Sequence, residues 1–293
     1  MIRIIESPRE GMQGFPRLLP AREKVRYINE LLKVGFDVVE AGSLVSPKMV
    51  PQMADSLEVL EGLDLGKTKS GLMFLALNSR GAEILSAFEQ ITHISFPFSF
   101  SPAFLKLNLN STPEKAIETA DKLVNLCGKT GKQAVIYISM AFGNPYGEPW
   151  NIGTLVEWVG VLYEMGVRTI PLSNVSYEID EKQILEVFST LVPMFPGVEF
   201  GLHLHSANEG WYDKVNAAYL AGCRRFDGVI NGLGGCPMAG NGLLGNLKTQ
   251  NLVEFAVEKK IPLNIDKEAL SRASAMAHEI FNPDKQWIVI NQT

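Results

Sequence analysis

The chain has 293 residues, of which 46% are hydrophobic and 20% charged, and its formal net charge is −5. This composition is typical of a globular protein that buries a substantial core, and it excludes an intrinsically disordered chain. The negative charge gives no electrostatic reason to expect nucleic acid or an anionic membrane surface as a partner.

The cysteines and the first ten residues indicate in which cellular compartment the protein works. The three cysteines are far apart and form no C-x-x-C pair, which favours free thiols in a reducing environment. The first ten residues predict a short strand and a polar turn and leave no room for the apolar core of a signal peptide. No apolar run is long enough to cross a bilayer. We therefore expect a cytoplasmic protein with no membrane partner.

Eight short β-branched or apolar runs predict strands. They are residues 2–5, 36–43, 70–77, 91–98, 133–140, 167–173, 198–205 and 225–232. Helical spacing lies between them at 21–35, 112–131, 151–166 and 210–222, and this alternation favours parallel βαβ units. We predict an α/β fold with a single domain over residues 1–293, namely a TIM (β/α)8 barrel over 1–255 and additional helices over 256–293. A doubly wound open sheet is the alternative, but its usual G-x-G-x-x-G is absent after the first strand.

Polar residues gather at the carboxyl ends of these predicted strands. Barrel active sites lie on that face, so these residues are the candidates for a functional site. In chain order they are Arg9, Glu10, Gln13, Glu40, Ser43, Tyr137, Ser139, Asn174, His203 and His205, and a glycine-rich segment, residues 231–246, follows the last strand.

The H-x-H sequence at the seventh strand places two imidazoles on one face, because side chains i and i+2 of a strand point the same way. Two neutral imidazoles form half of a site for a divalent metal. Taken alone, the same pattern is more often a hydrogen-bonded histidine pair at a strand end.

Several segments together resemble the 3-hydroxy-3-methylglutaryl-CoA lyases of the DRE-TIM metallolyase family, from residue 2 to about residue 255. The chain is identified as a divergent member of that family. The segments are SPREGMQ at the first strand, VVEAGSLVSPKMVPQMADSLEVL at the second, YISMAFGNPY at the fifth, GLHLHSANEG at the seventh and GLGGCPMAGNGLLGN after the eighth.

The resemblance implies a site of three kinds of residue. The ligands of a divalent cation, Mg²⁺ or Mn²⁺, would be Glu10, His203, His205 and Asn246. Arg9 would stabilise an enolate, Glu10 would share in the catalytic centre, and Cys236 would transfer a proton. A small loop hydrophobe is the alternative for Cys236. The substrate-binding candidates are Gln13, Glu40, Ser43, Tyr137, Ser139, Asn174 and, from the resemblance alone, Asn108.

The implied reaction is the aldol-type cleavage of 3-hydroxy-3-methylglutaryl-CoA, or of a related 3-hydroxy acyl thioester, to acetyl-CoA and a keto acid. The implied partners are an acyl-CoA substrate and a second copy of the chain in a homodimer. Three positions depart from the family pattern, because Glu10 replaces an aspartate while Asn174 and Gln250 replace acidic residues. These departures predict a changed substrate or a slower enzyme.

Two other functions stay open. One is a Claisen-type synthase of the same superfamily, which joins an acyl-CoA to a 2-oxo acid; the cysteine loop argues against it. The other is a barrel that binds a metal or ligand without turnover, which the lost carboxylates favour. Retention of Arg9, both histidines, Asn246 and Cys236 opposes the second alternative.

Overall fold

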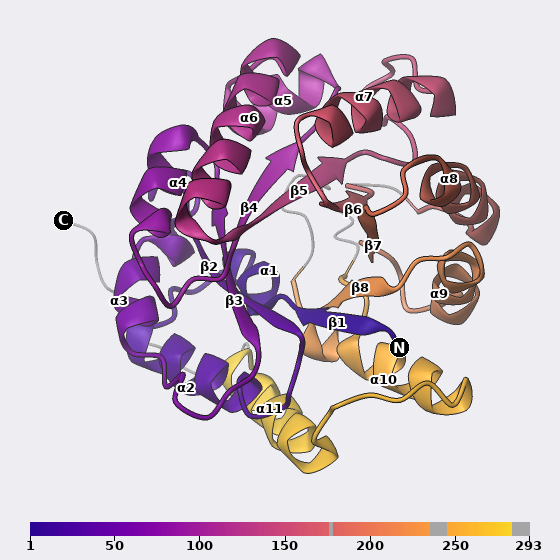
Figure 1. Cartoon of the computed structure of the whole chain (residues 1–293). Coiled ribbons are helices and arrows are strands. Elements are labelled where there is room, and N and C mark those ends of the chain that lie inside the picture. Colours follow the sequence, from indigo (N-terminus) through magenta and orange to yellow (C-terminus); the bar gives the residue numbers. More distant parts are fainter. Residues whose placement is uncertain (176–177, 235–244, 283–293) are drawn as a thin grey trace.

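Eight parallel strands close into a barrel in the computed structural model (Figure 1), which describes residues 1–175, 178–234 and 245–282. The strands follow one another around the barrel in chain order, and β1 pairs with both β2 and β8. They are β1 (Arg3–Glu6), β2 (Val38–Leu44), β3 (Gly71–Ala76), β4 (His93–Phe98), β5 (Gln133–Ser139), β6 (Thr169–Ser173), β7 (Glu199–His203) and β8 (Arg225–Gly228). Each strand overlaps a predicted run and extends at most one residue beyond it, although β7 and β8 end two and four residues before the ends of their runs. The TIM barrel is therefore confirmed and the open sheet is excluded.

Helices surround this barrel, as Figure 1 shows. They are α1 (Pro8–Gln13), α2 (Ala21–Leu31), α3 (Ser56–Glu61), α4 (Ser79–Ser86), α5 (Pro102–Leu109), α6 (Pro113–Thr130), α7 (Ile152–Glu164), α8 (Glu181–Met194), α9 (Trp211–Leu220), α10 (Thr249–Glu258) and α11 (Lys267–Ile280), with two 3₁₀ turns, η1 (Pro51–Met53) and η2 (Ile230–Gly232). Local signals set their ends. The Thr112 side chain caps α6 by accepting from the Lys115 N–H, and Gly131 ends the helix with a φ of 68°. In the described part of the chain, no helix is long and apolar enough to cross a membrane.

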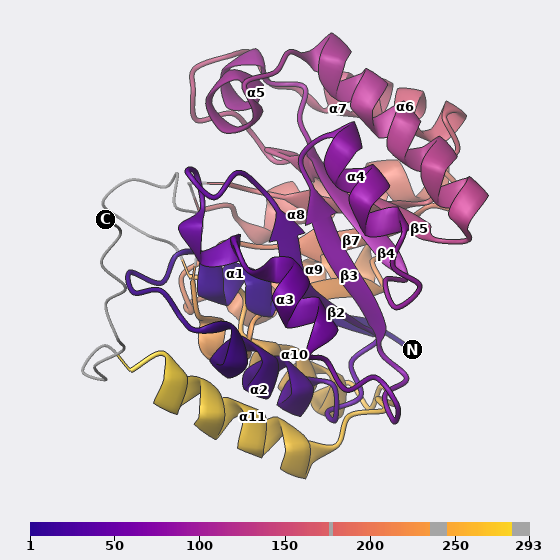
Figure 2. The ribbon, with the colours of Figure 1, turned by 90° about the vertical axis from the view of Figure 1, so that its left-hand side faces the viewer.

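The final helix lies outside the eight strand–helix units. Figure 2 shows α11 running beside α2 along the outside of the barrel, and the two helices are in contact. The predicted boundary between barrel and extension, at residues 255 and 256, falls inside α10, which packs against β8 and β1. The division at that point stays a prediction.

The inside of the barrel carries charge at its centre. Alternate residues of a strand face the interior, and in β8 the alternation RFDG buries both Arg225 and Asp227, with exposed fractions of 0% and 3%. An apolar cluster packs near them, formed by Ile5, Val38, Met73, Val135 and Tyr137. Gly201 on β7 makes room for the arginine, because a Cβ at that position would lie 2.8 Å from Arg225 Cδ.

Candidate active site

Helix α1 follows β1 directly and brings Arg9, Glu10 and Gln13 to the carboxyl-end face of the barrel. The guanidinium of Arg9 is held on two sides. Its Nη2 and Nε donate to Glu40 Oε2 at 2.8 and 3.2 Å, and its Nη1 lies 2.7 Å from Glu10 Oε1 and donates to Gln13 Oε1 at 3.0 Å. Gln13 Nε2 closes the ring by donating to Glu10 Oε2 at 3.0 Å. The structure therefore brings these four predicted residues together around one buried positive charge.

Glu40 supports this arrangement from β2. It is fully buried, and its second oxygen, Oε1, accepts from the Ser95 hydroxyl at 3.2 Å. Burial opposes charge on Arg9, but the carboxylates of Glu10 and Glu40 outweigh it and raise the arginine pKa above its ordinary value. The site thus keeps a fixed cation with a planar set of donors.

The two histidines lie together at the end of β7. The ring centroids of His203 and His205 are 5.2 Å apart, and both side chains are buried. The backbone of His205 forms a bridge with Asn246, the last residue of the glycine-rich segment, and this bridge places a third predicted ligand beside the histidines. Burial, together with the neighbouring His203, lowers the pKa of His205 to about 4. His205 is therefore neutral near pH 7, which is the form that binds a metal.

Two orphaned atoms fit the expectation of a cation. In the described residues, His205 Nδ1 and Asn246 Oδ1 are buried without a hydrogen-bond partner, a costly state that a bound cation relieves. No group of three His, Cys, Asp or Glu side chains within residues 1–175, 178–234 and 245–282 is arranged to hold a metal. Two imidazole nitrogens and an amide oxygen can coordinate a divalent cation, and Glu10, which would add the carboxylate that a hard ion prefers, stays a predicted fourth ligand.

Glu10 has the charge that such a ligand needs. Burial raises its pKa, but the charge of Arg9, followed by electrostatic interactions with His203 and His205, outweighs burial and holds the pKa below its ordinary value. Both of its oxygens are engaged, Oε1 by Arg9 and Oε2 by Gln13. A cation bound by Glu10 would share these oxygens with them.

Asn174, at the end of β6, is fully buried, and its amide pairs with the backbone of His205. The hydroxyl of Tyr137 donates to Asp227 Oδ2 at 2.7 Å, and its ring packs edge-on against His203. Asn174 therefore contacts the backbone of His205, and Tyr137 contacts the ring of His203. Substrate binding by either residue stays a prediction.

The remaining predicted residues are spread around the barrel. Ser43 and Ser139 are buried at the ends of β2 and β5. Asn108 lies on α5, where its amide donates to the Phe104 carbonyl of the same helix at 2.9 Å. Cys236 falls outside the residues that the structure describes. Gln250 links η2 to α11, because its amide bonds the backbone N–H and the side chain of Asn231 and the hydroxyl of Ser274.

The sequence reasoning missed Asp227. This residue accepts from Tyr137 and lies 3.2 Å, Oδ2 to Nδ1, from His203. Burial would raise its pKa, but the Arg225 charge and the hydrogen bonds from His203 and Tyr137 hold it below the ordinary value. The alternation of β8, which places positions 225 and 227 on the inner face of a barrel, was the signal that could have identified it.

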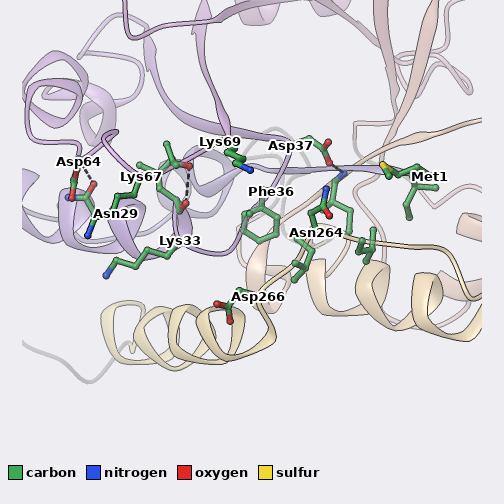
Figure 3. Close-up of a pocket in the computed structure, with 17 residues that line it drawn as sticks. Met1, Asn29, Lys33, Phe36, Asp37, Asp64, Lys67, Lys69, Asn264 and Asp266 are labelled. Carbon is green, nitrogen blue, oxygen red and sulfur yellow. Dashed lines mark hydrogen bonds between the residues drawn. The ribbon is translucent and has the colours of Figure 1, made fainter.

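A large cavity lies at the opposite end of the barrel. It measures about 1130 Å³, and Figure 3 shows Asp37, Asp64 and Asp266 around it together with three lysines, Lys33, Lys67 and Lys69. Most of its lining residues lie in the segments that lead into β1, β2 and β3, and the others lie between α10 and α11. TIM-barrel enzymes carry their sites at the carboxyl ends of the strands instead. We therefore place the candidate active site at the histidine pair and not in this cavity.

Comparison with known proteins shows the family of this chain. A family model described as HMGL-like matches residues 2–277. The chain belongs to the HMGL-like family. The predicted family is thereby confirmed, and with it the prediction that the protein is an enzyme of the lyase class.

Named relatives of this HMGL-like chain are lyases of acyl-CoA compounds. It is 29% identical over 276 residues to the hydroxymethylglutaryl-CoA lyase YngG of Bacillus subtilis, covering 93% of this chain and 90% of the relative. It is 30% identical over 281 residues to the (R)-citramalyl-CoA lyase of Chloroflexus aurantiacus, covering 92% and 87%. An HMG-CoA lyase structure from Acinetobacter baumannii, in complex with coenzyme A and 3-methylmalate, has a TM-score of 0.87 at 27% identity and 98% coverage of both chains. Identities of this size agree with a divergent member.

Proposed function

We propose that this protein is a divalent-cation-dependent carbon–carbon lyase. Its substrate would be 3-hydroxy-3-methylglutaryl-CoA or a related 3-hydroxy acyl thioester, and its products acetyl-CoA and a keto acid. Arg9 is buried and fixed by hydrogen bonds at the same face of the barrel as His205 Nδ1 and Asn246 Oδ1, two buried atoms that have no hydrogen-bond partner among the described residues. This placement is the observation that carries the proposal. One face of the barrel thus offers both an oxyanion partner and ligands for a cation.

The donors of His203, His205 and Asn246, with the carboxylate of Glu10, would hold the cation. A bound Mg²⁺ or Mn²⁺ would orient the substrate and lower the pKa of its 3-hydroxyl group. Cleavage removes one proton from that hydroxyl oxygen, breaks the C–C bond and leaves an enolate, to which one proton must return at carbon.

Arg9 would bind the oxygen of the developing enolate through its guanidinium, while Glu40 and Gln13 keep that group in one orientation. Because both supports hydrogen-bond the guanidinium directly, its orientation is set before bond breaking. Cys236 would return the proton to the enolate carbon from the glycine-rich loop. That role follows from the family pattern of its segment.

The substrate itself is expected to differ in detail from hydroxymethylglutaryl-CoA. Asn174 and Gln250 replace two acidic residues of the family pattern, and both amides are used in hydrogen bonds within the protein. Neither can accept a proton as a carboxylate would. A homodimer and a cytoplasmic location stay predictions from the resemblance and the composition.

The test is turnover by the purified protein with Mg²⁺ or Mn²⁺. Hydroxymethylglutaryl-CoA and (R)-citramalyl-CoA would be supplied separately, and formation of acetyl-CoA would be followed. We expect cleavage of at least one thioester, and its loss after chelation of the cation. His205→Ala is the matched control, since it removes one ligand at a strand end and should abolish tight cation binding while the circular-dichroism spectrum stays unchanged.

A ligand-binding barrel without turnover is the second candidate, favoured by the two engaged amides. It predicts full binding of Mn²⁺ and no cleavage of either thioester. Cleavage with a turnover that depends on Arg9 would exclude it. Absence of both cation binding and cleavage would instead reject the proposed function as a whole.

A further inference from the structure

A buried carboxylate lies directly behind one of the two histidines. Asp227 faces the barrel interior with an exposed fraction of 3%. Its Oδ2 lies 3.2 Å from His203 Nδ1 and accepts from the Tyr137 hydroxyl at 2.7 Å. The ring of Tyr137 meets His203 edge-on, so the imidazole is fixed by a hydrogen bond and by packing together.

A buried cation holds this carboxylate from the other side. The side chain of Arg225 is fully buried, with its Nε 3.4 Å from Asp227 Oδ1 and its Nη1 3.5 Å from Glu199 Oε2. Burying such a charge costs free energy that ion pairs only partly offset. Gly201 leaves the space that the arginine occupies, since any side chain at position 201 would collide with Arg225.

The direction of the hydrogen bond determines the tautomer of the imidazole. A carboxylate only accepts hydrogen bonds, so the ring nitrogen that faces it, Nδ1, carries the proton in neutral His203. The second nitrogen, Nε2, then keeps a free lone pair. Carboxylates that hold a ligating histidine in this way orient the ring and strengthen it as a ligand.

We propose that Asp227, held by Arg225, is a positioning residue that fixes the orientation and tautomer of His203, so that Nε2 presents its lone pair to the cation site. The role rests on the proposed function only in requiring that the site bind a divalent cation. It does not depend on which thioester is cleaved or on whether turnover occurs.

The tautomer is measurable without any cation. The chain has four histidines, so two-bond ¹H–¹⁵N spectra of protein labelled at histidine are simple, and His203→Gln assigns the signal. At a pH where the ring is neutral, we expect His203 to carry its proton on Nδ1 in the unsubstituted protein and to lose this preference in Asp227→Leu, which offers the ring no acceptor. A proton on Nε2 in the unsubstituted protein would overturn the proposal, as would an unchanged tautomer in the variant.

Cation affinity provides the second measurement, by calorimetric titration with Mn²⁺. We expect Asp227→Asn to bind Mn²⁺ about 10- to 100-fold more weakly. Glu30→Gln is the matched control, because it removes a buried carboxylate on α2 that pairs with Lys33 and Arg272 and is in ion-pair contact with neither His203 nor Arg225. Its affinity should stay within about twofold, as expected for a site with no shared partner of the ligand.

A variant that preserves charge balance keeps the test decisive if Asp227→Asn fails to fold. The double variant Asp227→Asn/Arg225→Met removes both buried charges together. If this variant folds and binds Mn²⁺ as tightly as the unsubstituted protein, the positioning role is wrong. If cation affinity follows the expected pattern and no thioester is cleaved, the positioning role stands and the proposed reaction fails.

Discussion

The amide of Asn174 makes two hydrogen bonds with the backbone of His205. Its Nδ2 donates to the His205 carbonyl at 2.6 Å, and its Oδ1 accepts from the His205 N–H at 2.8 Å. The side chain thereby ties the end of β6 to the residue that follows β7, as a neighbouring strand would. An amide has the donor and the acceptor that this pairing needs, whereas a carboxylate has acceptors only.

Asn174→Asp should therefore destabilise the protein, although aspartate is the residue of the family pattern. The substitution places an oxygen against the His205 carbonyl and leaves it without its donor, at a cost of about 1–3 kcal/mol. We expect a lower melting temperature in differential scanning calorimetry, with weaker Mn²⁺ binding. A faster lyase with an unchanged melting temperature would show that residue 174 serves the substrate instead of His205.

Glu10→Ala should weaken Mg²⁺ binding by at least tenfold, or roughly 1.4 kcal/mol. The cation would be left with imidazoles and an amide oxygen, a poor set for a hard ion. Glu10→Asp should weaken binding as well, because Arg9 and Gln13 hold the longer side chain in place. Calorimetric titration of both variants with Mg²⁺ gives the comparison.

Glu10→Gln separates charge from length in the same experiment. It keeps the reach of Glu10 toward Arg9 and Gln13 and removes the negative charge. An affinity close to that of Glu10→Ala would assign the effect to the charge. Normal Mg²⁺ binding by Glu10→Ala would remove this residue from the set of ligands.

Cys236→Ala should lower kcat by about 10²- to 10⁴-fold, the usual loss when a positioned proton-transfer group is removed. KM should change much less, because the thiol acts on the enolate and does not hold the thioester. Cys127→Ala is the control: this thiol is buried on α6, and burial raises its pKa to about 11. The control should keep its kcat, and an equal loss in both variants would refute a specific role for Cys236.

Glu6 links stability to pH. It lies at the end of β1, where its carboxyl group accepts from the Ile230 N–H and hydrogen-bonds the Thr249 hydroxyl. Burial raises its pKa from 4.5 to about 8, against the effect of both hydrogen bonds. Because the folded protein favours the protonated form, its contribution to stability is fully present below about pH 4.5 and is lost as the pH rises through about 8.

Glu6→Gln should flatten this dependence. Glutamine keeps hydrogen-bonding capacity without a charge, so the variant should gain melting temperature over the unsubstituted protein as the pH approaches 8. Glu61→Gln, an exposed position on α3, is the control and should leave the difference between acid and alkaline melting temperatures unchanged. A pH profile of Glu6→Gln that matches the unsubstituted protein would show that Glu6 does not titrate there.

The fold was predictable because strand runs and helical spacing are local signals. β7 could be placed from VEFGLHLH alone, although the strand ends at His203. His205 lies two residues beyond it and is brought beside His203 by its backbone contacts with Asn174 and Asn246. Arg9, Glu10 and Gln13 could likewise be grouped from the sequence, since all three lie on α1, the short helix directly after β1. These inferences need periodicity and the rule that barrel sites lie at strand ends.

The hydrogen-bond partners could not be predicted in the same way. Asn174 and Tyr137 sit at strand ends, as substrate-binding residues do, yet their polar atoms bond His205 and Asp227. The partner of a side chain inside the barrel depends on the register between strands that are distant in sequence, and local sequence signals do not set that register. Arg225 was missed for a further reason: a fully buried arginine contradicts the usual expectation that charge lies outside.

The gap that Gly201 leaves for Arg225 has a consequence for mutational screens. A substitution there would displace the guanidinium, and with it the support of Asp227 and the ring of His203. Gly201 would then score in a random library like a residue that touches the substrate, although its own backbone lies beneath the site. Shortening residue 225 would relieve the clash without restoring the support of Asp227, so it would recover folding and not cation affinity. Positions 201 and 225 thus form a pair whose tolerated amino acids depend on each other.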